Sequence, residues 1–280
     1  MERIRIVVDS AADLAPEDVA EYEIDVVSQV VTMGREAYED TALTRDEFWE
    51  LATRGAPGTS QPPVGAFEKA YERWVPRGYR VLCFTVTGRH SGTYNSARTA
   101  ALAYGDRVTV VDTLSLSAGQ GWQALAAAQM ARLQIPLNRI LDALQSIRQR
   151  THCYILLDSL GSLRRGGRAD RLMPFIDRLM RTLNLKPMIV VVEGELKLFG
   201  VVRSYQKGLE RMKQEMARIA PLERLAVLHT RRAEVAQQLA DELAALVSFP
   251  REQILVAETG AVLACHAGAG VSAVFGLSKG

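Results

Sequence analysis

Short apolar runs alternate with longer amphipathic patterns along the first half of the chain. The runs are rich in Val and Ile, which favour β-strands because branched side chains pack well on a pleated surface. They predict strands over 3–9, 24–33, 79–87 and 107–112. The alternation of such strands with helical patterns is typical of a mostly parallel sheet with flanking helices.

The segments between these runs predict helices. Thr44 and Glu47 have the spacing of a capping box, and Phe48, Trp49 and Leu51 follow at helical spacing. A Gly/Pro-rich stretch then predicts a loop over 54–63. Further helices are predicted over 64–75, from about 93, over 118–134 and from Pro136 to about Arg150.

The second half of the chain has a different pattern. A strand over 153–158 and a helix to about Leu183 come first, and residues 186–202 predict a β-hairpin. Later segments predict helices over 204–219 and 231–246, a strand over 225–230 and two short strands near the end, with residues 261–265 strand-like. We therefore expect two α/β domains: 1–155 with a mostly parallel sheet, and 156–280 with a mixed sheet.

Composition narrows the class of protein. At 280 residues the chain is long enough for two ordinary domains, and its net charge of +2 argues against general nucleic-acid binding. Cys83, Cys153 and Cys265 lack CxxC spacing, which disfavours disulfides and cysteine zinc sites. With no apolar run near 18 residues and no leader pattern, we expect a cytoplasmic protein without a transmembrane segment. No metal-binding or nucleotide-binding motif is present, so we expect neither a metal nor a cofactor.

Ser91 lies between a predicted strand and a predicted helix, in the stretch RHSGTYNSA. A nucleophile elbow would need glycines two positions before and after the serine, but Arg89 and Thr93 occupy those positions. Ser91 and Thr93 can instead bind an anion at the helix start, where free N–H groups point outward. They can equally cap their own helix.

A second pair of hydroxyls, Thr59 and Ser60, lies in the Gly/Pro-rich loop. These residues can face the same ligand as Ser91, because ligands of open α/β sheets bind outside the carboxyl ends of the strands. They can also serve only in a rigid turn. Asp9 and Ser10 end the first predicted strand, where a functional carboxylate and an ordinary helix cap are both common.

Two further stretches carry candidate residues. His266 starts the sequence HAGAG, which superficially matches a dinucleotide fingerprint, but too few residues follow it for the helix and strand that this motif needs. His266 can contact a ligand or be a buried, satisfied histidine. Arginines surround Gly166 and Gly167, and Arg203 follows the predicted hairpin; they form a solvated basic loop or a docking patch. The arginines around the glycines are Arg164, Arg165, Arg168 and Arg171.

Together, these stretches resemble the DegV family, whose characterised members bind fatty acids. The matching segments follow the family's order over almost the whole chain: 9–14, 59–67, 91–97, 110–121, 160–168, 185–204 and 266–270. The resemblance implies two α/β domains with a fatty acid bound between them. It departs from the family at His90, Pro63 and Ala269, where an apolar residue, a serine and a proline are usual.

The resemblance also implies roles for individual residues. The fatty acid carboxylate would be bound by a set of hydroxyl, backbone and imidazole groups: Thr59, Ser60, Ser91, Gly92, Thr93 and His266. Arg168 and Arg203 would contact a partner kinase or the phosphoryl group. The chain would then be a carrier, not an enzyme, that presents a long-chain fatty acid to a separate ATP-dependent fatty acid kinase for phospholipid synthesis.

Two other functions remain open from the residues. Ser91 and His266 are compatible with a serine acyl hydrolase or thioesterase, although the elbow pattern is missing. The chain can also be a carbonyl-binding protein similar to the substrate domain of dihydroxyacetone kinase, in which a histidine binds the ligand. An apolar stripe, mostly ordinary core by its spacing, offers candidate tail contacts: Leu172, Phe175, Ile176, Leu179, Met180 and Leu183.

Overall fold

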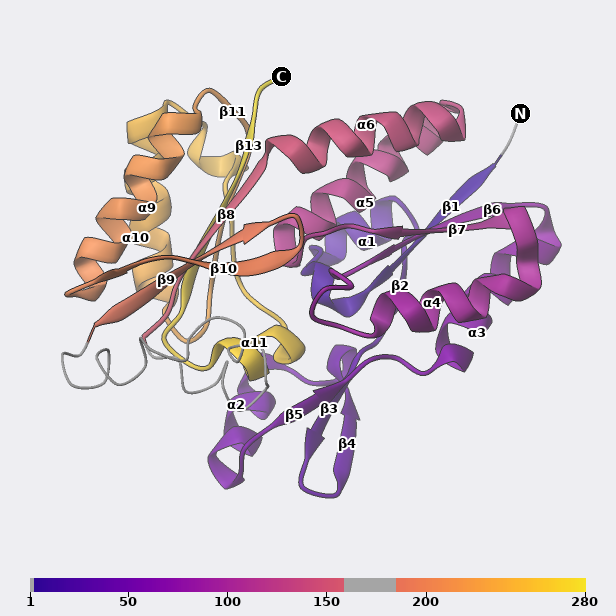
Figure 1. Cartoon of the computed structure of the whole chain (residues 1–280), viewed down its shortest axis with the longest axis horizontal. Helices are drawn as coiled ribbons and strands as arrows, with labels where there is room; N and C mark the ends of the chain where they lie inside the picture. The colour runs from indigo at the N-terminus through magenta and orange to yellow at the C-terminus, as the bar shows by residue number, and fades with distance from the viewer. Residues whose placement is uncertain (1–2, 159–184) are drawn as a thin grey trace. The chain divides into compact units, whose positions relative to one another are not determined.

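The computed structural model describes residues 3–158 and 185–280 (Figure 1). The chain divides into two compact units. The first unit comprises Met1–Gln149 together with Gly260–Val262, and the second comprises Arg150–Thr259 together with Leu263–Gly280. A three-residue segment from the far end of the chain therefore belongs to the first unit.

The main sheet of the first unit is entirely parallel. Its strand order is β2 (Asp25–Val27), β1 (Ile4–Asp9), β6 (Arg80–Thr85), β7 (Val108–Asp112). Helices α3 (Val64–Trp74) and α4 (Thr93–Ala101) lie on one side of these strands in Figure 1, and α5 (Ser117–Arg132) and α6 (Leu137–Arg150) lie on the other. The predicted parallel sheet with flanking helices is confirmed.

Two other parts of the first unit differ from the prediction. Residues 24–33 were predicted as one strand, but they form β2 and β3 (Val30–Met33), which lie in different sheets. The chain turns at Ser28 and Gln29 because the Gln29 amide donates to Ser10 Oγ and its side chain donates to Asp9. Strand β3 pairs with β4 (Glu36–Glu39) and with β5 (Gly58–Ser60), so part of the predicted loop over 54–63 is a short strand.

The predicted capping box is confirmed at the start of α2 (Arg45–Arg54). Thr44 Oγ1 accepts from the Glu47 amide at 3.2 Å, and Glu47 Oε2 accepts from the Thr44 amide at 2.8 Å. The remaining short elements of this unit are α1 (Pro16–Glu21) and the 3-10 turns η1 (Ser10–Ala12), η2 (Asp40–Ala42), η3 (Val75–Arg77) and η4 (Leu102–Arg107).

The second unit has a mixed sheet, as predicted. Its strand order is β10 (Glu195–Val202), β9 (Lys186–Val192), β8 (Thr151–Leu156), β13 (Ser272–Ser278), β11 (Leu222–His229), β12 (Leu255–Glu258). Among these strands, β11 and β12 pair in parallel and the other neighbours pair antiparallel. Strand β8 pairs with β13 and β9, and it belongs to the second unit, which begins at Arg150.

Helices α9 (Tyr205–Ile219) and α10 (Ala233–Val247) pack against the second sheet, and η5 (Arg251–Gln253) precedes β12. The core between them contains Met212, Met216, Leu239 and Leu243, all fully or nearly fully buried. The predicted hairpin over 186–202 is confirmed as β9 and β10. The predicted helix to about Leu183 and the apolar stripe on it lie outside the described residues.

Residues 261–265 are not strand-like, as the sequence suggested, but form most of α11 (Ala261–Ala267). A short apolar run without polar positions has no period that distinguishes a buried strand from a buried helix. Here the hydrogen bonds that amides at its start donate to Asp13 and Asp40 favour the helix.

Gly208 in α9 lies against Leu156, which is fully buried. We expect Gly208→Ala to lower the free energy of unfolding by about 1–3 kcal/mol, because overpacking a filled core forces its neighbours to move. A Cβ at this position would lie 2.6 Å from Leu156 Cδ2. Urea unfolding followed by circular dichroism measures the change.

The matched control is Gly65→Ala in α3, where the nearest atom to a new Cβ is Glu68 Oε2 at 3.8 Å. This substitution should be neutral or stabilising, because Ala favours helices over Gly. An equal loss of stability in both variants would contradict the packing explanation for Gly208.

Candidate functional site

The turn between β6 and α4 carries hydroxyls at the start of the helix. Ser91 Oγ lies 2.8 Å from Thr93 Oγ1 and accepts a hydrogen bond from the Thr93 amide at 3.2 Å. Thr93 is fully buried, whereas Ser91 is partly exposed. Ser91 thus contacts the hydroxyl and the amide of Thr93, as in a Ser/Thr turn that orders the helix start.

The loop with Thr59 and Ser60 comes against this turn. Both residues lie in β5, paired with Val31 and Val30 of β3. Gln61 follows, and a Cβ built on Gly92 would lie 2.7 Å from Gln61 Cδ. The Gln61 side chain thus lies against Gly92, where a larger residue would displace it.

A buried carboxylate, Asp9, accepts from the Val86 amide, which directly follows β6 and precedes the turn that carries Ser91. Asp9 has no exposed surface and accepts from four donors: the Ala11 amide at 2.9 Å, Gln29 Nε2 at 2.9 Å, the Val86 amide at 2.6 Å and Gln120 Nε2 at 3.1 Å. Burial raises the pKa of Asp9 to about 6, although these hydrogen bonds oppose the shift. The sequence left Asp9 open between a cap and a functional carboxylate, and it is the N-cap of η1 as well as a link between four segments.

A second carboxylate, Asp112 at the end of β7, holds the same turn. Its oxygens accept from the Gly88 amide at 3.2 Å and from the Leu114 amide at 3.0 Å. Sequence reasoning did not select Asp112, Gln29 or Gln120. The available signal was positional, because Asp9 and Asp112 end parallel strands of one sheet, where functional polar groups gather.

In the second unit, His266 lies near the end of α11 and is partly buried. The turn that follows contains Gly268 and Gly270, with φ of 75° and 85°, a region that favours glycine. Thr230 Oγ1 donates to the Gly268 carbonyl at 2.6 Å and accepts from the Val271 amide at 3.0 Å. The turn after His266, which contains Ala269, is therefore fixed by Thr230.

Arg203 is exposed and immediately precedes Ser204, the N-cap of α9. A groove of about 440 Å³ lies between the β9–β10 hairpin and α9. Its lining combines apolar and charged residues: Met188, Phe199, Gly200, Val201, Val202, Lys207, Glu210, Arg211 and Gln214. Arg168 and the other arginines of the basic loop lie outside the described residues.

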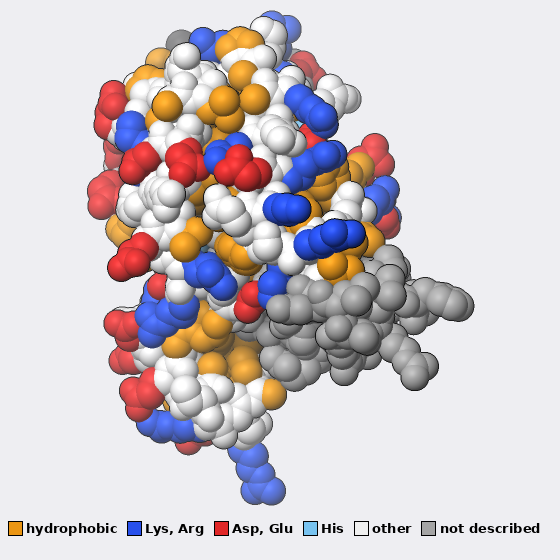
Figure 2. All heavy atoms as spheres, turned by 90° about the vertical axis from the view of Figure 1, so that its left-hand side faces the viewer, with side chains coloured by type: hydrophobic (Ala, Val, Ile, Leu, Met, Phe, Trp, Pro, Cys, Tyr) orange, Lys and Arg blue, Asp and Glu red, His pale blue; other side chains and the backbone are white. Residues whose placement is uncertain are grey.

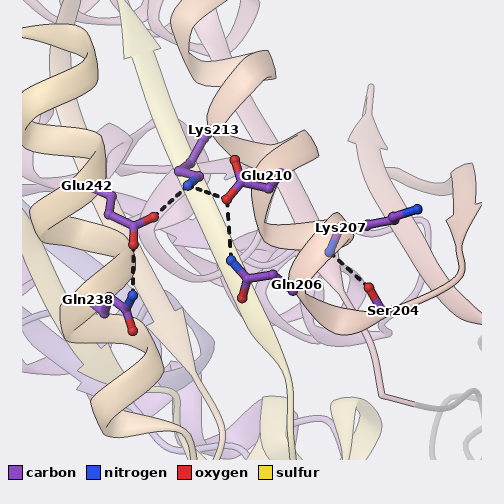
Figure 3. Close-up of polar contacts among 7 residues, drawn as sticks. All are labelled: Ser204, Gln206, Lys207, Glu210, Lys213, Gln238 and Glu242. Atoms are coloured by element: carbon purple, nitrogen blue, oxygen red, sulfur yellow. Dashed lines mark hydrogen bonds and ion pairs between the residues drawn. The ribbon is translucent and has the colours of Figure 1, made fainter.

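The charges around this groove are unevenly paired. Lys213 bridges Glu210 at 2.7 Å and Glu242 of α10 at 2.6 Å, whereas the Lys207 side chain points away from this network (Figure 3). Arg211 stacks over Phe199, with its guanidinium carbon 5.2 Å from the ring centroid. Figure 2 shows Lys and Arg side chains beside hydrophobic ones on the side that carries α9 and α10.

Among residues 3–158 and 185–280, no group of three or more His, Cys, Asp or Glu side chains is arranged to hold a metal ion. None of the helices described is both long and apolar enough to cross a membrane.

Comparison with known proteins identifies the class to which this fold and these loops belong. The family model described as "Uncharacterised protein, DegV family" matches residues 3–279. A DegV domain-containing protein of Listeria innocua is 32% identical, with 98% of each chain covered, and one of Deinococcus radiodurans is 33% identical, with 97% of each covered. The chain belongs to the DegV family.

Solved structures agree with this assignment. A DegV family protein from Thermus thermophilus, whose structure is described as showing fatty acid binding, is 30% identical and superimposes with a TM-score of 0.85. The match covers 99% of this chain and 100% of that one. DegV from Bacillus subtilis, described as a fatty acid binding protein, is 25% identical, with a TM-score of 0.85 and full coverage of both chains.

The raised pKa of Asp9 predicts a specific pH dependence of stability. Because the folded protein holds this proton up to about pH 6 and the unfolded chain releases it near 3.8, the associated stability is present below pH 3.8 and is lost as the pH rises through 6. The loss should be about 2 kcal/mol between pH 4 and 7. Urea unfolding of the wild type and Asp9→Asn across this range measures it.

Subtracting the Asp9→Asn curve removes the contribution of all other carboxylates. The difference should slope downward with pH between 4 and 6 and be flat above 7. A flat difference throughout would show that Asp9 titrates at its ordinary pKa.

Proposed function

We propose that this protein binds one long-chain fatty acid and holds its carboxylate with neutral donors. The proposed donors are the hydroxyls of Thr59, Ser60, Ser91 and Thr93, the backbone of Gly92 and the imidazole of His266. The observation that carries the proposal is the approach of Gln61, which follows Thr59 and Ser60, to Gly92, which follows Ser91. The fatty acid binding described for the related proteins of T. thermophilus and B. subtilis supports it.

The hydrocarbon tail of such a ligand contributes most of the binding free energy, and its carboxylate determines how the ligand is positioned. Burying about 15 methylenes contributes roughly 12 kcal/mol before losses, at about 0.8 kcal/mol per CH₂. Lost translational freedom and chain ordering offset much of this gain. Each charge-assisted hydrogen bond to the carboxylate adds about 1.5–3 kcal/mol before desolvation.

Neutral donors suit a carboxylate that must react later. An arginine clamp would stabilise both oxygens of the anion strongly, whereas hydroxyls leave an oxygen free to attack a phosphoryl group. We therefore propose that the protein is a carrier rather than an enzyme. A separate ATP-dependent kinase would transfer the γ-phosphoryl group of ATP to the carboxylate, which gives an acyl phosphate and ADP.

The proposed surface for this kinase includes Arg203 and Arg168. Arg203 stands in sequence between Val202 and Lys207, both of which line the groove beside α9. Lys207 contributes a positive charge to the edge of that groove, whereas Glu210 pairs with Lys213 and Arg211 pairs with Glu215 at 2.8 Å. An acidic partner surface with apolar side chains would complement it.

The hydrolase alternative is less well supported. A serine nucleophile needs a general base within hydrogen-bond reach. Ser91 Oγ instead hydrogen-bonds with the hydroxyl and the amide of Thr93. A donor so arranged is suited to binding an anion rather than to losing its own proton.

The head-group site can be tested by removing two hydroxyls from its two loops. Thr59→Ala with Ser91→Ala should lower the affinity for palmitate at least tenfold, since each lost hydrogen bond to a charged group contributes about 1.5 kcal/mol or more. Titration with a fluorescent fatty acid and mass spectrometry of co-purified lipid are the measurements.

Thr99→Ala is the matched control, because Thr99 Oγ1 donates to the Asn95 carbonyl within α4 and the residue is exposed. It should bind palmitate like the wild type. Wild-type affinity in the double variant would remove these hydroxyls from the site, and a wild-type protein that takes up no fatty acid would contradict the proposed function.

The partner surface can be tested separately from lipid binding. Arg203→Ala should leave palmitate affinity unchanged but slow acyl phosphate formation by the kinase from the same genome at least tenfold, because an exposed guanidinium that pairs with phosphate or carboxylate is lost. Phosphate transfer from labelled ATP provides the rate. Arg139→Ala, at an exposed position of α6, should leave both quantities unchanged. A normal rate in the Arg203 variant would exclude this residue from the partner surface.

A further inference from the structure

The three-residue segment Gly260–Val262 is bound to the first unit by two carboxylates. The Gly260 amide donates to Asp13 Oδ1 at 2.8 Å, and the Val262 amide donates to Asp40 Oδ1 at 3.0 Å. These four residues are grouped in the same unit, although the chain on both sides of the segment is not.

The bonded amides are those at the start of α11. The first amides of a helix have no partner within it, and the helix dipole gives them a positive character. The Ala261 amide also donates to Asp40, so consecutive amides of the first turn are satisfied by ionisable oxygens. Such charge-assisted bonds are roughly twice as strong as neutral ones, and they fix both the start and the direction of a short helix.

The two carboxylates are themselves held in place. Asp13 Oδ2 accepts from Ser117 Oγ at 2.5 Å, at the start of α5. Asp40 is only 3% exposed and accepts from the Ser10 side chain, with the charge of Arg45 nearby. Neither acceptor is a freely rotating surface group, so the pair forms a fixed support rather than an adaptable one.

The residue before α11 fits this support closely. A Cβ built on Gly260 would lie 3.3 Å from Asp13 Oδ1 and 3.5 Å from each oxygen of Asp40. The absence of a side chain allows both carboxylates to approach the backbone at once. Burial raises the pKa of Asp40, as expected for a carboxylate that is retained for its hydrogen bonds in a poorly solvated place.

We propose that Asp13 and Asp40 are positioning residues that fix the start of α11 and, through this helix of seven residues, the imidazole of His266. The pair acts on His266 through the helix and does not touch the ligand. The consequence for lipid binding rests on the proposed function, in which His266 contacts the fatty acid carboxylate. The consequence for the helix itself does not.

The test compares Asp13→Asn, Asp40→Asn and the double variant with Asp25→Asn. In each Asp13 or Asp40 variant the negative charge is lost and one acceptor oxygen becomes an NH₂ donor, so the bonds to the helix amides are no longer charge-assisted. Asp25 is a matched control because its carboxylate also links elements of the first unit, through Arg73 at 2.6 Å and Trp74, without contacting α11. The readouts are amide hydrogen exchange over 260–267, the NMR titration of His266 and palmitate affinity. The chain has four histidines, so the His266 signal can be assigned by its loss in His266→Gln.

In the Asp13 and Asp40 variants only, we expect amide exchange over 260–267 to become about tenfold faster for each lost charge-assisted bond. We also expect the His266 resonance to shift in these variants only. Palmitate affinity should fall in parallel, by about tenfold in the double variant. If Asp25→Asn lowers stability as much as the Asp13 and Asp40 variants do but changes none of these readouts, the changes at α11 come from lost positioning of the helix and not from a general loss of stability.

Unchanged exchange and an unchanged His266 resonance in both single variants would overturn the inference, whatever the palmitate affinity. The same changes in Asp25→Asn would also overturn it, because they would reflect global opening. If the wild type binds no palmitate while exchange and the His266 resonance respond as expected, the positioning role stands and the proposed function fails.

Discussion

The carboxylate of Asp9 is removed completely from water and is kept in the structure by hydrogen bonds from four donors. Those donors come from the turn after β1, the β2–β3 connection, the end of β6 and the start of α5. An unpaired charge at such a depth would be very unfavourable, so all four segments must reach the same point for the unit to fold. The turn that carries Ser91 begins after Val86, one of these donors.

The protein's polar groups divide into those that hold the backbone and those proposed to bind a ligand. Asp9, Asp13, Asp40 and Asp112 all accept hydrogen bonds from backbone amides at loop or helix starts. The proposed head-group donors are uncharged by comparison. This division suits a carrier, because ionised groups supply rigidity where no chemistry is required and neutral groups meet the anion without binding it too firmly to react.

Much of the fold follows from local patterns. The runs over 3–9, 79–87 and 107–112 become buried parallel strands, and Thr44 with Glu47 starts α2, because these signals involve neighbouring residues only. Two predictions failed where a distant contact decides. Strand β2 ends before Ser28 because Gln29 donates hydrogen bonds to Asp9 and Ser10. The apolar run that begins at residue 261 is helical because amides at its start donate to Asp13 and Asp40.

The sequence by itself determined the family, the two α/β parts and the hydroxyl residues that are candidates for the head group, since motif order, strand pattern and residue type are all local properties. Only the tertiary structure decided what Asp9, Asp13, Asp40 and Asp112 do. A carboxylate at the end of a strand looks the same in the sequence whether it binds a ligand, caps a turn or holds a segment more than 200 residues away. The difference lies in which backbone amides the packed chain brings within about 3 Å of its oxygens.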